Sequence, residues 1–188
     1  EEAQSVTVTV EDEEPEPPVD TEGPTVTIQG IRPGFVYGHS QRPNLRWNVR
    51  PTGDEVTRVV ATLDGKLVEA GKVDLTQLTL GRHVVKVTAV DARGNRTVES
   101  VAFRVGTSVA DVKRIVNRAE KDGAMTKVVR RDLIAGLTRA NTFTEKGRTA
   151  LAREQLLEVR RLALRIEDKR TRQVVRKDIA MLVRQLNR

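Results

Sequence analysis

Few residues of this chain have side chains suited to nucleophilic chemistry. The sequence holds two histidines, His39 and His83, and no cysteine. A serine hydrolase needs a serine, a histidine and an acid that converge in one cleft. Ser40 directly follows His39, but this adjacency supplies neither an acid nor an oxyanion hole. His83 begins an apolar strand pattern, where a structural, hydrogen-bonded histidine is expected. The sequence therefore predicts no catalytic residue and no enzyme within these residues.

The sequence also contains few residues in a pattern that could bind a metal or a cofactor. Two isolated histidines without cysteine do not make a usual zinc set. The acidic run Glu11–Glu16 lacks the ligand spacing and the glycine turn of a calcium loop. Asp91 and Asn95 could hold a calcium ion, but a turn-forming role explains both residues first. No glycine-rich phosphate loop precedes a helix. We predict no cofactor and no metal.

Aromatic side chains are the usual platform for sugar rings, and this chain has five of them. Trp47 and Phe103 fall on the apolar faces of strand patterns, so we expect them in a core. Phe35, Tyr37 and Phe143 remain as the candidate ligand surface, with Phe35 and Tyr37 as a small platform in one loop.

A row of cations is the second candidate surface. Arg161, Arg165 and Lys169 are spaced four apart and are predicted to share one face of a third helix, with Arg172 continuing beyond it. Such a row could contact the phosphates of an anionic polymer. The alternative is a solvated face, because two glutamates precede the row on the same face and neutralise part of it. We favour the solvated face.

Charge is strongly segregated along the chain, although the net charge is only +7. Residues 1–22 hold nine acidic and no basic residues, whereas residues 107–188 hold twenty-one basic and ten acidic residues. A basic segment behind an acidic leader favours interaction with polyanions.

The first 23 residues differ from the rest in composition and hydrophobic pattern. Val6–Val10 alternates valine and threonine, which predicts a strand, and we assign residues 1–10 to the terminal strand of a preceding domain. Residues 11–23 form an acidic, proline-rich linker. The alternative is that the strand pairs with an edge of the following sandwich, in the same or a neighbouring chain. Because the chain opens at Glu1 and not at methionine, we expect any targeting sequence to lie upstream.

Residues 24–106 repeat a period-two alternation about seven times, with one apolar and one polar face. Asp64-Gly65 is a tight hairpin signal between two of these strands. This pattern predicts an immunoglobulin-like antiparallel β-sandwich.

Residues 107–188 contain no proline and change to the helical period. Four amphipathic helices are expected, the first capped by Ser108, the second starting near Thr126 and the fourth following Thr171. Short loops between them predict a small four-helix bundle. The expected fold class is therefore multidomain, all-β followed by all-α, and no apolar stretch approaches the ~20 residues of a membrane span.

Several motifs are similar to known modules. The stretches LRWNV, ATLDGK, LTLGRHVVKVTAVDARGNRT and VAFRV resemble the immunoglobulin-like repeats of secreted actinobacterial proteins. The segment from Ser108 onward resembles the FIMAH helical domain in its helix closing on Lys121-Asp-Gly-Ala124, in Ala140-x-x-x-Thr144 and in Glu145-Lys-Gly147. It departs from that family at Leu157–Leu164, where the family has an aromatic-led stretch.

These resemblances imply an extracellular setting. Such domains accompany secreted hydrolases, lyases and sugar dehydrogenases, and attachment to sugar or the cell surface is the role usually supposed. We therefore expect a non-catalytic accessory region of a secreted or cell-surface bacterial protein, serving as a spacer and a C-terminal attachment module. Extracellular polysaccharide, cell-wall polymer and the upstream domain of the same polypeptide are the expected partners.

Two alternatives stay open. The region could be a protein–protein interaction module that docks on its own upstream catalytic domain, or a basic helical domain that binds polyanions. Nucleic acid is disfavoured, because no aromatic interleaving or groove-reading motif accompanies the basic row.

Overall fold

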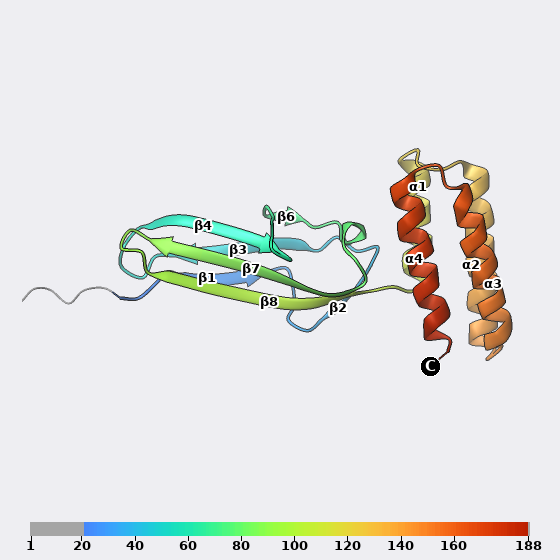
Figure 1. The fold of residues 1–188 in the computed structure, drawn as a ribbon, viewed down its shortest axis with the longest axis horizontal. Coiled ribbons are helices and arrows are strands. Elements are labelled where there is room, and N and C mark those ends of the chain that lie inside the picture. The colour runs from blue at the N-terminus through green and yellow to red at the C-terminus, as the bar shows by residue number, and fades with distance from the viewer. Residues whose placement is uncertain (1–20, 188) are drawn as a thin grey trace, which may run out of the picture.

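The computed structural model describes residues 21–187. The β-strands form an elongated part, and four α-helices stand at one end of it (Figure 1). The predicted strand Val6–Val10 and most of the predicted linker 11–23 lie outside the described residues. Within the described residues, no helix has the length and apolar character needed to cross a membrane.

Eight strands of the described chain form two sheets. The first sheet has three strands in the order β1 (Thr25–Gln29), β3 (Asn44–Arg50) and β6 (Gly71–Lys72). The second has five in the order β2 (Val36–Gly38), β8 (Arg96–Gly106), β7 (Gly81–Asp91), β4 (Val56–Leu63) and β5 (Lys66–Leu67). Short 3-10 turns also occur: η1 (Leu75–Gln77) among the strands and η2 (Ala163–Arg165) among the helices.

One strand pair departs from the predicted antiparallel arrangement. β2 runs parallel to β8, with Val36 opposite Arg104, whereas the other paired strands are antiparallel. The prediction of a wholly antiparallel sandwich is therefore wrong at this edge. The chain leaves the first sheet after β1 and crosses to the second, and so it does not fold back as a hairpin, the connection that would make neighbouring strands antiparallel.

The inward faces of both sheets form one hydrophobic core. Leu45 of the first sheet and Val85, Val87 and Phe103 of the second are almost fully buried and belong to the same cluster. Val85 and Val87 alternate with more exposed neighbours, because successive side chains of a strand point to opposite faces. The two sheets therefore pack face to face as a β-sandwich.

The hairpin signal at Asp64-Gly65 is confirmed. The two residues join β4 to β5, with Leu63 paired to Lys66, and both adopt positive φ values of 52° and 79°. A two-residue turn with positive φ at both positions matches the twist of the flanking strands.

The four helices are α1 (Val109–Lys121), α2 (Lys127–Glu145), α3 (Thr149–Leu162) and α4 (Lys169–Gln185). Side chains of Ser108, Thr126 and Asp168 cap α1, α2 and α4 by accepting the backbone N–H of the residue three positions on. The predicted starts at Ser108 and Thr126 are confirmed. The fourth helix begins earlier than predicted, because Asp168 is its cap.

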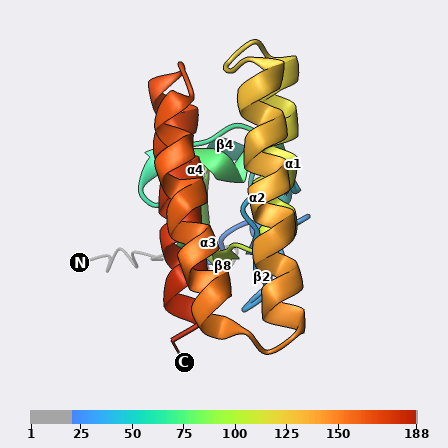
Figure 2. The same ribbon diagram turned by 90° about the vertical axis from the view of Figure 1, so that its right-hand side faces the viewer.

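A second hydrophobic cluster lies between the helices. It is built on fully buried side chains from each of them, including Val112, Leu133, Leu137, Val159 and Ile179. Consecutive helices contact one another, and α1 also contacts α4 (Figure 2). α2 and α3 pack closely at Gly136, where an added Cβ would collide with the side chain of Val159.

Candidate functional site

Two consecutive residues after β2, His39 and Ser40, connect the strands to the helices through buried side chains. His39 Nδ1 lies 2.7 Å from Oδ1 of Asp178 on α4. Ser40 Oγ donates to Oδ1 of Asp111 on α1 at 2.5 Å. His39, Ser40, Asp111 and Asp178 are each between 0% and 6% exposed. We call these four residues the buried junction.

Each carboxylate of the buried junction also has a partner for its second oxygen. Thr107 Oγ1 donates to Asp178 Oδ2 at 2.9 Å, and Ser108 Oγ donates to Asp111 Oδ2 at 2.6 Å. A buried carboxylate is costly unless it is paired and hydrogen-bonded, and here both are. The junction is therefore a satisfied polar contact between the two hydrophobic clusters.

Two further contacts at the backbone of Gly38 and Ser40 connect the strands to α1. Arg118 of α1 donates to the backbone carbonyl of Ser40 at 2.9 Å. A Cβ at Gly38 would collide with the carboxylate of Asp111, so only glycine leaves that carboxylate its space.

Serine, histidine and aspartate meet in the junction, but not in the order of a hydrolase triad. A triad requires the serine hydroxyl to bond the imidazole. Ser40 Oγ instead donates to Asp111, and His39 Nε2 lies 3.3 Å from the carbonyl of Leu78. This geometry holds the strands and helices together and leaves Ser40 without an imidazole base.

The protonation of His39 is tuned by its surroundings. Burial acts to lower the pKa of His39, but the hydrogen bond and charge of Asp178, the Leu78 carbonyl and the charge of Asp111 together raise the pKa above its ordinary value of 6.5. The protonated imidazole is the form that pairs with Asp178.

We expect this pairing to make stability depend on pH. A histidine whose pKa is higher in the folded state stabilises the fold fully below the unfolded pKa of about 6.5, and the contribution is lost as pH rises through the raised value. Denaturant unfolding at a series of pH values should show the free energy of unfolding decreasing over this interval. The decrease should be absent in His39→Gln; a decrease of the same size in that variant would contradict the assignment.

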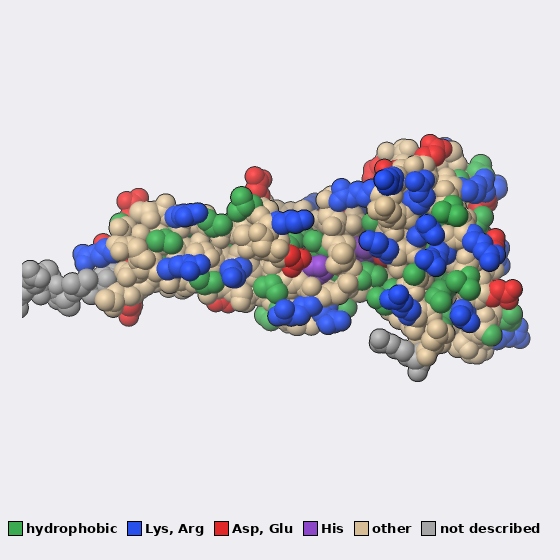
Figure 3. All heavy atoms as spheres, in the orientation of Figure 1, with side chains coloured by type: hydrophobic (Ala, Val, Ile, Leu, Met, Phe, Trp, Pro, Cys, Tyr) green, Lys and Arg blue, Asp and Glu red, His purple; other side chains and the backbone are tan. Residues whose placement is uncertain are grey.

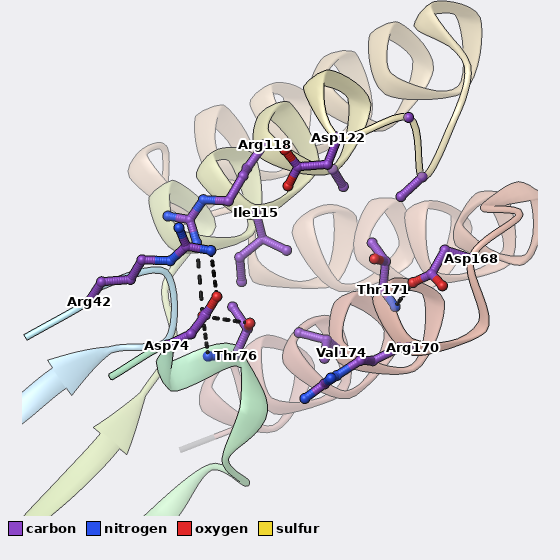
Figure 4. Close-up of a pocket in the computed structure, with 13 residues that line it drawn as sticks. Arg42, Asp74, Thr76, Ile115, Arg118, Asp122, Asp168, Arg170, Thr171 and Val174 are labelled. Atoms are coloured by element: carbon purple, nitrogen blue, oxygen red, sulfur yellow. Dashed lines mark hydrogen bonds and ion pairs between the residues drawn. The ribbon is translucent and has the colours of Figure 1, made fainter. Parts of the chain in front are cut away.

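A cavity of about 470 Å³ opens beside the buried junction, between the strands and helices α1 and α4. Arg42, Asp74 and Thr76 line it from the strand side, while Arg118 and Thr171 line it from the helices (Figure 4). Groups of both charges face this space, so it suits a small polar molecule better than an apolar one.

Asp74 organises one wall of this cavity. Its carboxylate accepts hydrogen bonds from the backbone and hydroxyl of Thr76 at 3.1 and 2.7 Å and from Arg42 at 2.5 Å, with Arg118 4.0 Å away. Burial acts to raise the pKa of Asp74, but the bonds from Thr76 and Arg42 outweigh it and hold the pKa below its usual range.

Residues 21–187 contain no group of three or more histidine, aspartate or glutamate side chains placed to hold a metal ion.

The candidate aromatic surface is divided by the fold. Phe35 is 41% exposed, but Tyr37 is buried and packs edge-on against Phe35 and Phe103, with ring centroids 4.8 and 5.8 Å away. The expected two-ring platform therefore reduces to Phe35, because the Tyr37 hydroxyl turns inward and accepts the N–H of Arg32. Phe143 lies on α2 and lines a separate cavity of about 420 Å³.

The predicted basic row does not lie on one helix. α3 ends at Leu162, and the turn η2 and the cap Asp168 separate Arg161 from Lys169, the first residue of α4. This break has no proline or glycine to mark it in the sequence. The row is also partly engaged: Arg161 pairs with Glu158 at 3.4 Å, Arg165 with Asp132 at 3.3 Å, and Arg172 donates to the carbonyl of Ile166 at 2.8 Å.

Sequence reasoning missed the carboxylates of the buried junction. Asp178 stands between Val175 and Ile179 in the apolar stripe of α4, and a charged residue within such a stripe is a signal of a buried partner. Asp111 lies three residues after the cap Ser108, a spacing that by itself indicates a role in capping α1 and not a contact with Ser40.

Comparison with known proteins gives little further guidance. No family model and no curated protein matches the chain, so the resemblances to actinobacterial immunoglobulin-like repeats and to the FIMAH domain stay predictions. Among solved structures, the fibronectin(III)-like modules of Clostridium thermocellum CbhA are similar at a TM-score of 0.35 and 16% identity. That match covers 45% of this chain and 99% of the other. A likeness this low carries no argument about function.

Proposed function

We propose that this chain is a non-catalytic accessory region in which the β-sandwich is a rigid spacer and the four helices form a terminal attachment unit. In this proposal the units are residues 24–106 and 107–188, and the setting is a secreted or cell-surface protein. Extracellular glycan or cell envelope is the proposed anchor.

The buried junction is the observation that supports the rigid spacer in this proposal. Only Thr107 stands between the end of β8 and the cap Ser108, and the side chains of His39 and Ser40 bond carboxylates on two different helices. Hydrogen bonds are directional, so two such contacts on α1 and α4 oppose both bending and rotation. A loosely tethered domain would not need buried partners on both sides.

Distance measurements between spin labels test the rigidity. The chain has no cysteine, so Leu67→Cys and Leu164→Cys, at side chains 82% and 54% exposed, give two unique labelling sites. We expect one narrow distance distribution, which broadens when His39→Gln is added and does not change when the exposed Glu167 is replaced by alanine. A broad distribution in the doubly labelled parent would refute the rigid spacer.

Attachment is tested separately by retention on insoluble polysaccharides and on peptidoglycan carrying teichoic acid. Retention on one glycan at both low and high salt would support attachment. Absence of retention on all of them would leave only the spacer role.

A further inference from the structure

A second groove adjoins the first cavity at the contact between strands and helices, and Thr76, Arg170 and Val174 line both. It has a volume of about 640 Å³ and runs between the segment Thr76–Leu80 and one face of α4. Its floor is apolar, with Leu78, Leu80, Val174 and Met181 among the lining residues. We call this feature the basic groove because of the side chains around that floor.

Five lysine and arginine side chains line the basic groove together with His39, and no carboxylate does. They are Arg160, Arg170, Arg176, Lys177 and Arg184. None forms an ion pair within 4.0 Å with a carboxylate of residues 21–187, unlike Arg161 and Arg165 nearby. Lysine and arginine side chains are numerous over the helices in Figure 3.

One of these cations is left unsatisfied inside the protein. The Nε atom of Arg176 is buried and has no hydrogen-bond partner. A buried donor without a partner costs free energy, and an acceptor brought by a ligand would remove that cost. The Nε atom itself is covered by protein atoms, so a ligand in the groove would reach it only after the Arg176 side chain turns outward.

The spacing of the cations indicates an extended ligand. Arg170, Lys177 and Arg184 are seven residues apart on α4, so they share a face and lie about 10 Å apart along the helix axis. Three cations at this interval can contact acids along an extended chain over about 20 Å.

The residues that line the groove also restrict the chemistry of its ligand. None of the lining residues is phenylalanine, tyrosine or tryptophan, so the groove has no such ring on which a nucleobase or a sugar could stack. An apolar floor between cations fits a peptide that alternates carboxylates with proline or aliphatic side chains.

This chain itself contains an acidic peptide that is interrupted and followed by prolines. Residues 1–22 hold nine acidic and no basic residues, and the run Glu11–Glu16 is followed by two prolines and a valine. We propose that the basic groove is a docking site for an extended acidic peptide and that its occupant is the run Glu11–Glu16 of a second copy of this chain.

Chain length explains why the run comes from a second copy. Gly23 lies against Arg96 and Thr97, at the end of β8 far from the helices. β8 has eleven residues and spans about 36 Å toward the helices. Glu16 is seven residues before Gly23 and reaches about 25 Å at full extension, whereas Glu11, twelve residues before Gly23, reaches about 42 Å. The first acids of the run could therefore touch the near end of their own groove, but the whole run cannot lie along it. Docking between copies is then head-to-tail.

Sedimentation of the full chain tests this proposal. A groove variant carries Arg170→Glu, Lys177→Glu and Arg184→Glu, and a run variant carries Glu11→Gln, Glu13→Gln, Glu14→Gln and Glu16→Gln. A charge-matched control carries Lys127→Glu, Lys146→Glu and Arg153→Glu at exposed positions outside the groove. Circular dichroism melting confirms that each variant is folded.

We expect the parent and the control to self-associate at about 0.05 M salt and to dissociate toward monomers at about 0.5 M. Both the groove and the run variants should associate at least about tenfold more weakly. Mixing these two variants should give a one-to-one complex and nothing larger, because only one intact groove and one intact run are then present. The groove is formed by both parts of the chain, so docking rests on the rigid contact of the proposed function; a narrow spin-label distance distribution without self-association would refute the docking alone.

Two results would overturn the proposal. The first is a parent chain that stays monomeric at low salt, or a run variant that associates as strongly as the parent. The second is binding of inorganic polyphosphate or a thymidine oligonucleotide that the groove variant loses, with self-association the same in all variants. That result would assign the groove to a phosphate polymer.

Discussion

Replacement of Asp178 by alanine is expected to lower the free energy of unfolding by about 3–5 kcal/mol. The carboxylate is 0% exposed and accepts hydrogen bonds from both His39 and Thr107, at 2.7 and 2.9 Å. Its removal leaves the buried His39 and the half-buried Thr107 without their partner and removes the negative charge that pairs with the protonated imidazole. The loss should exceed that in Asp178→Asn, which keeps an acceptor oxygen.

Denaturant unfolding followed by circular dichroism measures this change. Glu167→Ala is the matched control, because Glu167 is an exposed acid of the same part and should change stability by less than about 0.5 kcal/mol. If Asp178→Ala were as mild as the control, the buried junction would contribute little to holding the helices on the strands.

The replacement Leu137→Ala should have the next largest effect, a loss of about 2–5 kcal/mol. Leu137 is 0% exposed in the hydrophobic cluster between the helices, so truncation removes buried methyl groups and leaves a cavity. The helix itself should not suffer, since alanine is the best helix former. The destabilisation therefore measures packing between helices and not helix propensity.

Leu164→Ala is the comparison for this variant, because Leu164 is 54% exposed and its truncation leaves no internal cavity. Thermal unfolding by calorimetry should show a lower transition temperature for Leu137→Ala and little change for Leu164→Ala. Equal effects at both positions would mean that the cluster is not closely packed around Leu137.

Local signals predicted the regular elements well. The turn at Asp64-Gly65 and the caps at Ser108 and Thr126 depend on residues within three or four positions of each other, so their chemistry is visible in the sequence. The start of α4 was missed because the apolar spacing begins after its cap, Asp168.

Contacts between distant residues were not predictable in this way. His39 and Asp178 are 139 positions apart, and neither residue in the sequence indicates the other as its partner. The parallel pairing of β2 with β8 depends on which sheet the chain enters after Gln29, a choice made by packing and not by alternation. The same holds for Tyr37, whose burial follows from its contact with Phe103.

The position of β8 in the sandwich has a mechanical consequence. Gly23 lies beside one end of β8, and Gly106 at the other end leads into the helices (Figure 1). Tension between these two points acts along the strand, parallel to its axis and across its hydrogen bonds to β7. Residues Gly81–Val90 of β7 are paired with β8 in one continuous antiparallel register. Such a load shears all of these bonds together instead of unzipping them one by one, so the sandwich should resist extension under pull.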